Sequence, residues 1–127
     1  MVEKWDRWMN NLENLAVVET ALIDEYRQSL GREILNDLLE TYMSDAQARV
    51  QSIVQYYQAG DIKDVESEAT AMQGAAANVG AQRVAEVAKE LQLAAAQNNT
   101  NSLKLLVPKL QAEVTLAVGE MQPLLNE

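Results

Sequence analysis

Apolar residues recur at steps of three and four positions along almost the whole chain, and this spacing marks one face of an α-helix. The five clearest series run from Val2 to Ala16, Leu35 to Tyr57, Ile62 to Val79, Val84 to Ala94 and Leu103 to Leu124. No segment alternates with a period of two for long enough to predict a strand. Two prolines and five glycines are also too few for a fold with many tight turns. The pattern therefore predicts an all-α protein.

Helix-breaking residues divide these series, and the breaks lie at Gly31, Gly60-Asp61, Gly80 and the polar run Asn98-Asn99-Thr100. Gly31 separates a helix expected near residues 19–29 from a long helix expected near 32–58. Asp61 is placed to cap the helix that follows, and the glycines can end helices in the left-handed conformation. Pro108 lies inside the last helix and should kink it, because proline removes one backbone donor.

Helices joined by such short turns lie antiparallel to their neighbours. We therefore expect a single domain over residues 1–127. It should consist of an antiparallel up-down four-helix bundle at about 17–125, preceded by an extra N-terminal helix at about 2–15. A chain of 127 residues is long enough to bury such a core without disulfides or a metal ion.

The residue types that the chain lacks exclude several kinds of chemistry. It contains no cysteine, which excludes disulfides, thiol catalysis and thiolate metal sites, and no histidine, the commonest metal ligand and general base. No phosphate loop or nucleophile elbow is found. Acid pairs such as Asp24/Glu25 and Glu66/Glu68 are typical of solvated helix faces. A carboxylate metal site would need inward-facing glutamates on four helices, and the apolar stripes leave no room for such a site. We expect neither an enzyme nor a cofactor or metal site.

The charge balance narrows the choice of partners. Nineteen acidic and ten basic residues give a formal net charge of −9, which repels nucleic-acid phosphate and anionic lipid. No apolar run approaches the ~20 residues of a membrane-spanning helix, and no targeting segment is visible. We expect a cytoplasmic, monomeric protein whose partner is neither a nucleic acid nor a membrane.

One segment carries a more specific signal. Residues 69–81 read Ala-Thr-Ala-Met-Gln-Gly-Ala-Ala-Ala-Asn-Val-Gly-Ala. This resembles the signature of histidine-containing phosphotransfer (HPt) domains, which is roughly His, any residue, Leu, Lys, Gly, several small residues, Asn, Leu or Val, Gly, Ala. The matching positions are Met72, Gly74, Ala75, Ala76, Asn78, Val79, Gly80 and Ala81. With its flanking helices the resemblance covers residues 17–124. It implies an HPt-like bundle whose partner is a response-regulator receiver domain or a hybrid histidine kinase.

The same register places Thr70 where the family has its phosphorylatable histidine, and Gln73 where it has a lysine that helps hold the phosphoryl group. A threonine hydroxyl needs a general base to become nucleophilic, and its phosphate ester is too stable for a relay. The resemblance therefore implies a pseudo-HPt, which binds receivers as a competitor or scaffold without carrying phosphate. Two alternatives remain open: a helical adaptor that binds an unrelated protein, or a working phosphotransferase whose histidine has been replaced.

Helix geometry indicates which surface would meet a partner. At about 100° per residue, Gly74 and Thr70 face away from the apolar stripe of their helix. An exposed mid-helix glycine costs roughly 0.5–1 kcal/mol relative to alanine, and close approach of a partner would explain it. Neutral drift of the sequence, or contact of Gly74 with the N-terminal helix, would also explain this glycine. The predicted partner-binding residues are Glu66, Thr70, Gln73, Gly74 and Ala77.

Two tryptophans in the expected N-terminal helix allow two interpretations. Trp5 lies on the apolar stripe of that helix, and Trp8 lies beside it. The helix either packs on the bundle with both rings partly buried, or presents them as a second contact surface, since exposed tryptophan is enriched at interaction sites.

Overall fold

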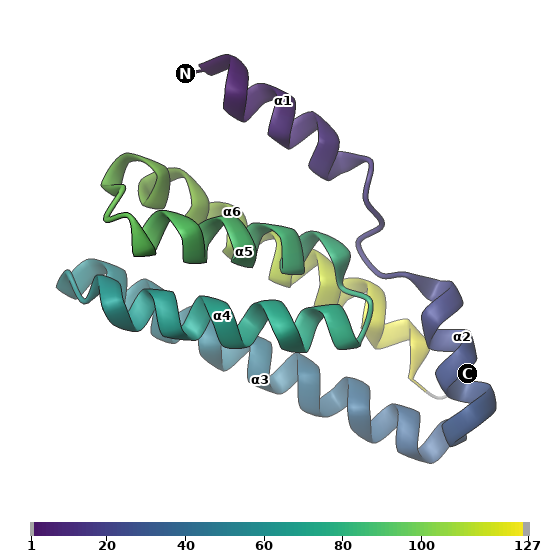
Figure 1. Ribbon diagram of the computed structural model, residues 1–127. Coiled ribbons are helices and arrows are strands. Elements are labelled where there is room, and N and C mark those ends of the chain that lie inside the picture. Colours follow the sequence, from purple (N-terminus) through teal and green to yellow (C-terminus); the bar gives the residue numbers. More distant parts are fainter. Residues whose placement is uncertain (1, 126–127) are drawn as a thin grey trace.

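The computed structural model describes residues 2–125, and over that range the chain is all-helical, as the apolar spacing predicts (Figure 1). The elements are α1 (Val2–Glu13), α2 (Thr20–Leu30), α3 (Arg32–Ala59), α4 (Ile62–Asn78), α5 (Gln82–Ala96), α6 (Thr100–Met121) and the short 3₁₀ helix η1 (Gln122–Leu124). The helices expected near 19–29 and 32–58 are shifted or extended by a single residue, because the glycines stop them where expected.

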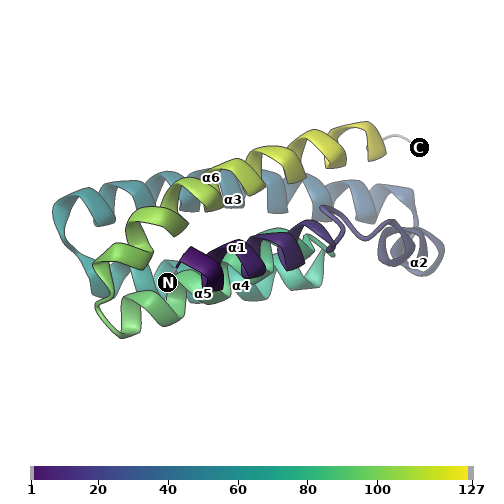
Figure 2. The ribbon, with the colours of Figure 1, turned by 90° about the horizontal axis from the view of Figure 1, so that it is seen from above.

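The last four α-helices form an antiparallel bundle, and α1 is the extra N-terminal helix (Figures 1 and 2). Helices α3 and α5 each pack against both α4 and α6. Helices α4 and α6 lie diagonally opposite each other across the bundle. Helix α2 packs against α3 at one end of the bundle, and α1 lies outside the bundle along α5. The predicted fold is thus confirmed.

The core consists of the predicted apolar stripes, whose members are mostly buried. On α4 and α5 the buried residues are Val65, Ala69, Met72, Ala76, Val84, Val87, Ala88, Leu91, Ala94 and Ala95. Because half of these side chains are alanine, the two backbones can approach closely, and this helix pair shares the most extensive contact in the molecule. One side of α4 is therefore firmly packed, and the other is left for solvent or a partner.

Glycines end two bundle helices in the way the sequence predicts. Gly60 (φ 79°) and Gly80 (φ 76°) both have the positive φ of the left-handed region, where an L side chain is strained. The predicted cap at Asp61 is wrong in its detail. Asp61 does occupy the N-cap of α4, but its side chain accepts no capping hydrogen bond. Its ψ of 68° falls short of the extended value that directs an N-cap side chain toward the helix N–H groups.

The N-terminal helix ends at Glu13, two residues earlier than expected, and Ala16 is exposed although it continues the apolar spacing. Arg83 of α5 accounts for this end. Its guanidinium donates from Nε to the carbonyl oxygen of Leu15 at 2.8 Å and from Nη2 to that of Glu13 at 3.0 Å. These bonds satisfy carbonyl groups that a continuing helix would otherwise have bonded internally, and they tie the end of α1 to α5.

Helix α6 contains Pro108 and continues as one helix from Thr100 to Met121. Because proline has no N–H, the carbonyl group of Lys104 loses its helical donor, and both residues are exposed to solvent. The kink at Pro108 stays a prediction.

Among the described residues, no helix combines the length and the apolar character needed to span a membrane.

Candidate functional site

The five predicted partner-binding residues lie on one outward surface of α4, which we call the α4 face. Its members are Glu66, Thr70, Gln73, Gly74 and Ala77. Thr70, Gly74 and Ala77 are exposed, whereas Glu66 and Gln73 are half-buried. A Cβ added to Gly74 would have no neighbour within 4 Å. Helix α1 contacts α5 rather than α4, so the N-terminal helix does not explain this glycine. The prediction that Gly74 and Thr70 face outward is confirmed.

Thr70 lacks the surroundings of an activated nucleophile. Its Oγ1 donates a hydrogen bond to the carbonyl oxygen of Glu66, one turn earlier in α4, at 2.9 Å. A hydroxyl has a single proton, so the outward side of this oxygen offers only lone pairs. In the described part of the chain no carboxylate accepts a hydrogen bond from it, and the sequence has no histidine. A general base of the kind that activates a hydroxyl is therefore missing at this position.

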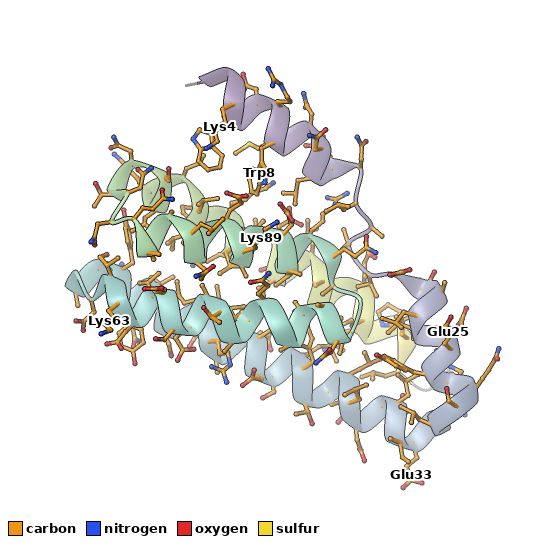
Figure 3. The ribbon with its side chains drawn as sticks, in the orientation of Figure 1. Lys4, Trp8, Glu25, Glu33, Lys63 and Lys89 are labelled. Atoms are coloured by element: carbon orange, nitrogen blue, oxygen red, sulfur yellow. The ribbon has the colours of Figure 1, made fainter. Side chains whose placement is uncertain are left out.

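Gln73 borders a shallow groove beside the α4 face. The groove has a volume of about 370 Å³, and its lining includes Gln73 and Ala77 of α4, Glu86 and Lys89 of α5, and Glu19 of the segment between α1 and α2. Figure 3 shows this side of the bundle, with Lys89 labelled on α5. Within the described residues Lys89 forms no ion pair. The basic group of this surface thus comes from α5, not from the position of Gln73.

An ion-pair network fixes α4 to α3. Arg49 of α3 lies 2.9 Å from Glu68 (Nη1 to Oε2) and 2.8 Å from Asp45 (Nε to Oδ2). Hydrogen bonds to Asp45 and Glu68 raise the pKa of Arg49 above its ordinary value. The interpretation of Glu68 as a solvated acid is therefore wrong, because this half-buried carboxylate needs a charged partner across the helix pair. Asp24 and Glu25 are exposed, as expected.

The turn between α4 and α5 is held by α2 and the residue before it. The backbone N–H of Glu19 donates to the carbonyl oxygen of Gly80 at 2.9 Å, and the hydroxyl of Tyr26 donates to that of Asn78 at 2.7 Å. Gln82 donates from Nε2 to the Glu19 carboxylate at 2.8 Å. The second half of the signature is therefore structural. Glu19 and Tyr26 were not singled out from the sequence, because no local pattern signals bonds between residues so far apart.

The N-terminal helix packs on the bundle, and the prediction of partly buried tryptophans is confirmed. Trp5 and Trp8 are half-buried and meet edge to face, with ring centroids 5.5 Å apart. Trp8 donates from Nε1 to Oε1 of Glu86 on α5 at 3.4 Å, and Lys4 Nζ lies 5.2 Å from the Trp5 ring centroid. A second contact surface at these rings stays a prediction.

Three buried side-chain polar atoms of the described residues lack a hydrogen-bond partner, namely Nη2 of Arg27, the hydroxyl of Tyr42 and Oε1 of Glu113, and none belongs to the α4 face. Glu113 of α6 is 1% exposed, 3.2 Å from Lys109, and its Oε1 has no hydrogen-bond partner. The apolar stripes did not indicate this single inward carboxylate. Glu113 lies three residues after Leu110, a spacing that could have revealed it. Burial raises the pKa of Tyr42 on α3, whose hydroxyl is likewise unpaired. Among the described residues, no acidic cluster could hold a metal ion.

The comparisons with known proteins agree with this geometry. The Hpt domain model matches residues 37–122. The crystal structure of histidine-containing phosphotransfer protein B (HptB) from Pseudomonas aeruginosa is similar in fold, with a TM-score of 0.79 and 20% sequence identity over 84% of this chain and 92% of that chain. No curated protein matches significantly. Because the family model covers more than half of the sequence, the chain belongs to the Hpt domain family, the histidine-containing phosphotransfer family of phosphorelay signalling.

Proposed function

We propose that the protein is a pseudo-HPt, a phosphorelay module that binds receiver domains through the α4 face and does not itself carry phosphate. The partner is a response-regulator receiver domain, either alone or within a hybrid histidine kinase. By occupying the receiver surface the protein competes with phosphate-carrying domains or acts as a scaffold.

The observation that carries the proposal is that a chain of the Hpt family contains no histidine. A neutral imidazole nitrogen is nucleophilic near neutral pH, and the sequence provides no such group in any register. Thr70 stands at the corresponding position, with its hydroxyl proton bonded to the main chain. Gln73 replaces the lysine of the signature by a neutral amide. Both groups that the transfer chemistry needs are thus replaced.

Three properties of the α4 face support a retained docking role. The face lacks a bulky side chain at Gly74, so a partner helix could approach the backbone there. Three of its five residues, Thr70, Gly74 and Ala77, are exposed in the described chain. Its helix is held from both sides, by the close packing against α5 and by the ion pair between Glu68 and Arg49 of α3. A rigid, uncovered helix surface is suited to recognition by a preformed partner.

Binding and phosphate uptake can be measured separately. Purified receiver domains from the same organism are titrated into the protein in a calorimeter, and we expect at least one to bind. The receiver that binds is then phosphorylated with a radiolabelled donor and incubated with the protein. We expect no acid-labile label on the protein, because it has no histidine to form a phosphoramidate.

The matched variant is Thr70→His combined with Gln73→Lys. Both positions lie outside the buried core, so the variant should fold and should accept some phosphate from a matched donor. Stoichiometric labelling of the unchanged protein would refute the non-carrier role. Failure to bind any receiver would refute the receiver partner and favour the adaptor alternative. A variant that binds the receiver but accepts no phosphate would show that the surface around Thr70 also differs from that of phosphate-carrying Hpt domains.

A further inference from the structure

The α4 face is poor in hydrogen-bond donors around the position where a phosphoryl group would arrive. Thr70 presents only lone pairs outward, because its proton is bonded to the carbonyl oxygen of Glu66. The Glu66 side chain is itself an acceptor. Within the face the amide of Gln73 is the side-chain donor that remains, and it carries no charge.

The charges that surround the face add to this bias. The adjoining groove brings the carboxylates of Glu19 and Glu86 together with one ammonium group, Lys89. Together with Glu66, the groove lining contributes three carboxylates and one ammonium group, while the nearby guanidinium of Arg83 is bonded to the carbonyl oxygens of Leu15 and Glu13. On α3 the guanidinium of Arg49 is already shared between two carboxylates.

Charged residues farther from the face do not reverse this excess of acceptors and negative charge. Lys63 lies seven residues before Thr70, and its Cα–Cβ bond tilts toward the N-terminus of α4, away from Thr70. Asp64 follows directly with the opposite charge. The whole chain carries a formal net charge of −9. The α4 face therefore lies in a region of net negative charge.

We infer that the α4 face binds its receiver partner more tightly in the unphosphorylated than in the phosphorylated form. This inference rests on the proposed function. A phosphoryl group carries about two negative charges and three strong acceptor oxygens, so it needs donors and cations where this surface offers acceptors and carboxylates. The protein would bind the unphosphorylated receiver and release it once the receiver is phosphorylated, so that the phosphorylation state of the receiver regulates the complex.

The test compares the affinities for one receiver in two states. The receiver that binds most tightly in the calorimetric panel is titrated alone and after activation with beryllofluoride, a stable phosphoryl mimic. We expect at least about fivefold weaker binding to the activated form, a ratio within the range of ordinary energetic coupling. The ratio should fall toward one at about 1 M salt, where the Debye length is near 3 Å.

Charge variants distinguish two causes of a lower affinity for the activated form: the charge of the α4 face, and a conformational change that activation produces in the partner. Gln73→Lys adds a cation to the α4 face and should reduce the ratio between the two affinities. Gln111→Lys makes the same charge change at an exposed position of α6, the helix diagonally opposite α4, and should leave the ratio unchanged. An equal or tighter affinity for the activated form would overturn the inference while leaving the proposed function intact. A ratio that Gln73→Lys leaves unaltered would overturn it too. Absence of binding to both forms would overturn the proposed function as well.

Discussion

Gly74 and Gly80 belong to the same short signature, yet their surroundings are opposite. A Cβ at Gly74 would meet nothing within 4 Å, whereas one at Gly80 would lie 3.2 Å from Glu19 Cβ and 3.3 Å from Leu22 Cδ2. Gly80 also has a φ of 76°, and Gly74 lies within a regular helix. The fold thus requires a glycine at position 80 and does not require one at position 74. One half of the signature maintains the turn onto which α2 packs, and the other half shapes a surface.

The largest effect should follow from Gly80→Ala. The new side chain must adopt a left-handed backbone and displace Glu19, which together should lower the free energy of unfolding by about 2–4 kcal/mol. Urea denaturation measures this loss. Gly60→Ala is the matched control, because Gly60 has a similar φ of 79° but open space around it. A loss at Gly80 no greater than at Gly60 would show that the close approach of Glu19 costs nothing.

The next effect concerns binding. Gly74→Arg should weaken receiver affinity at least about tenfold, because a long side chain at a close helix contact leaves the partner no room. The variant should fold, since arginine is a good helix former. Gly119→Arg on α6 introduces the same side chain at another exposed glycine with open space and should leave binding unchanged. Equal affinities for both variants and the unchanged protein would remove the α4 face from the interface.

A smaller effect should come from Tyr26→Phe. It removes the hydrogen bond to the carbonyl oxygen of Asn78 and should lower the free energy of unfolding by about 0.5–1.5 kcal/mol. Tyr56→Phe removes a hydroxyl that forms no hydrogen bond to the described residues, and it should have little effect. Receiver affinity should stay nearly constant in both variants. A loss of affinity in Tyr26→Phe without a loss of stability would mean that the turn belongs to the binding surface.

The smallest change should be a gain. Gly74→Ala should raise the free energy of unfolding by up to about 1 kcal/mol, because alanine restricts the unfolded chain and favours the helix. The melting temperature, compared with that of Gly119→Ala, measures it. Destabilisation by Gly74→Ala would contradict the open surroundings of this residue. It would mean that the fold requires glycine at position 74 as it does at position 80.

The features that the sequence predicted are those that local spacing encodes. The stripe from Val65 to Ala76 is buried as expected, and the helical wheel placed Gly74 and Thr70 on the outward side. Arg83 could not be assigned from spacing, since it bonds to carbonyl groups about 70 residues earlier in the chain. The inward position of Glu113 depends on its partner Lys109. Contacts such as those of Arg83 arise only when the helices have assembled, whereas the Lys109–Glu113 pair lies within α6 at a spacing of four residues.

The two tryptophans of the protein both lie in α1, outside the four-helix bundle. Intrinsic fluorescence therefore reports on the seating of this one helix against α5, while circular dichroism is dominated by the other five α-helices. A denaturation curve followed by emission describes the detachment of α1, and the ellipticity curve describes the melting of the bundle. The separation between the two midpoints would measure how independently the N-terminal helix comes away.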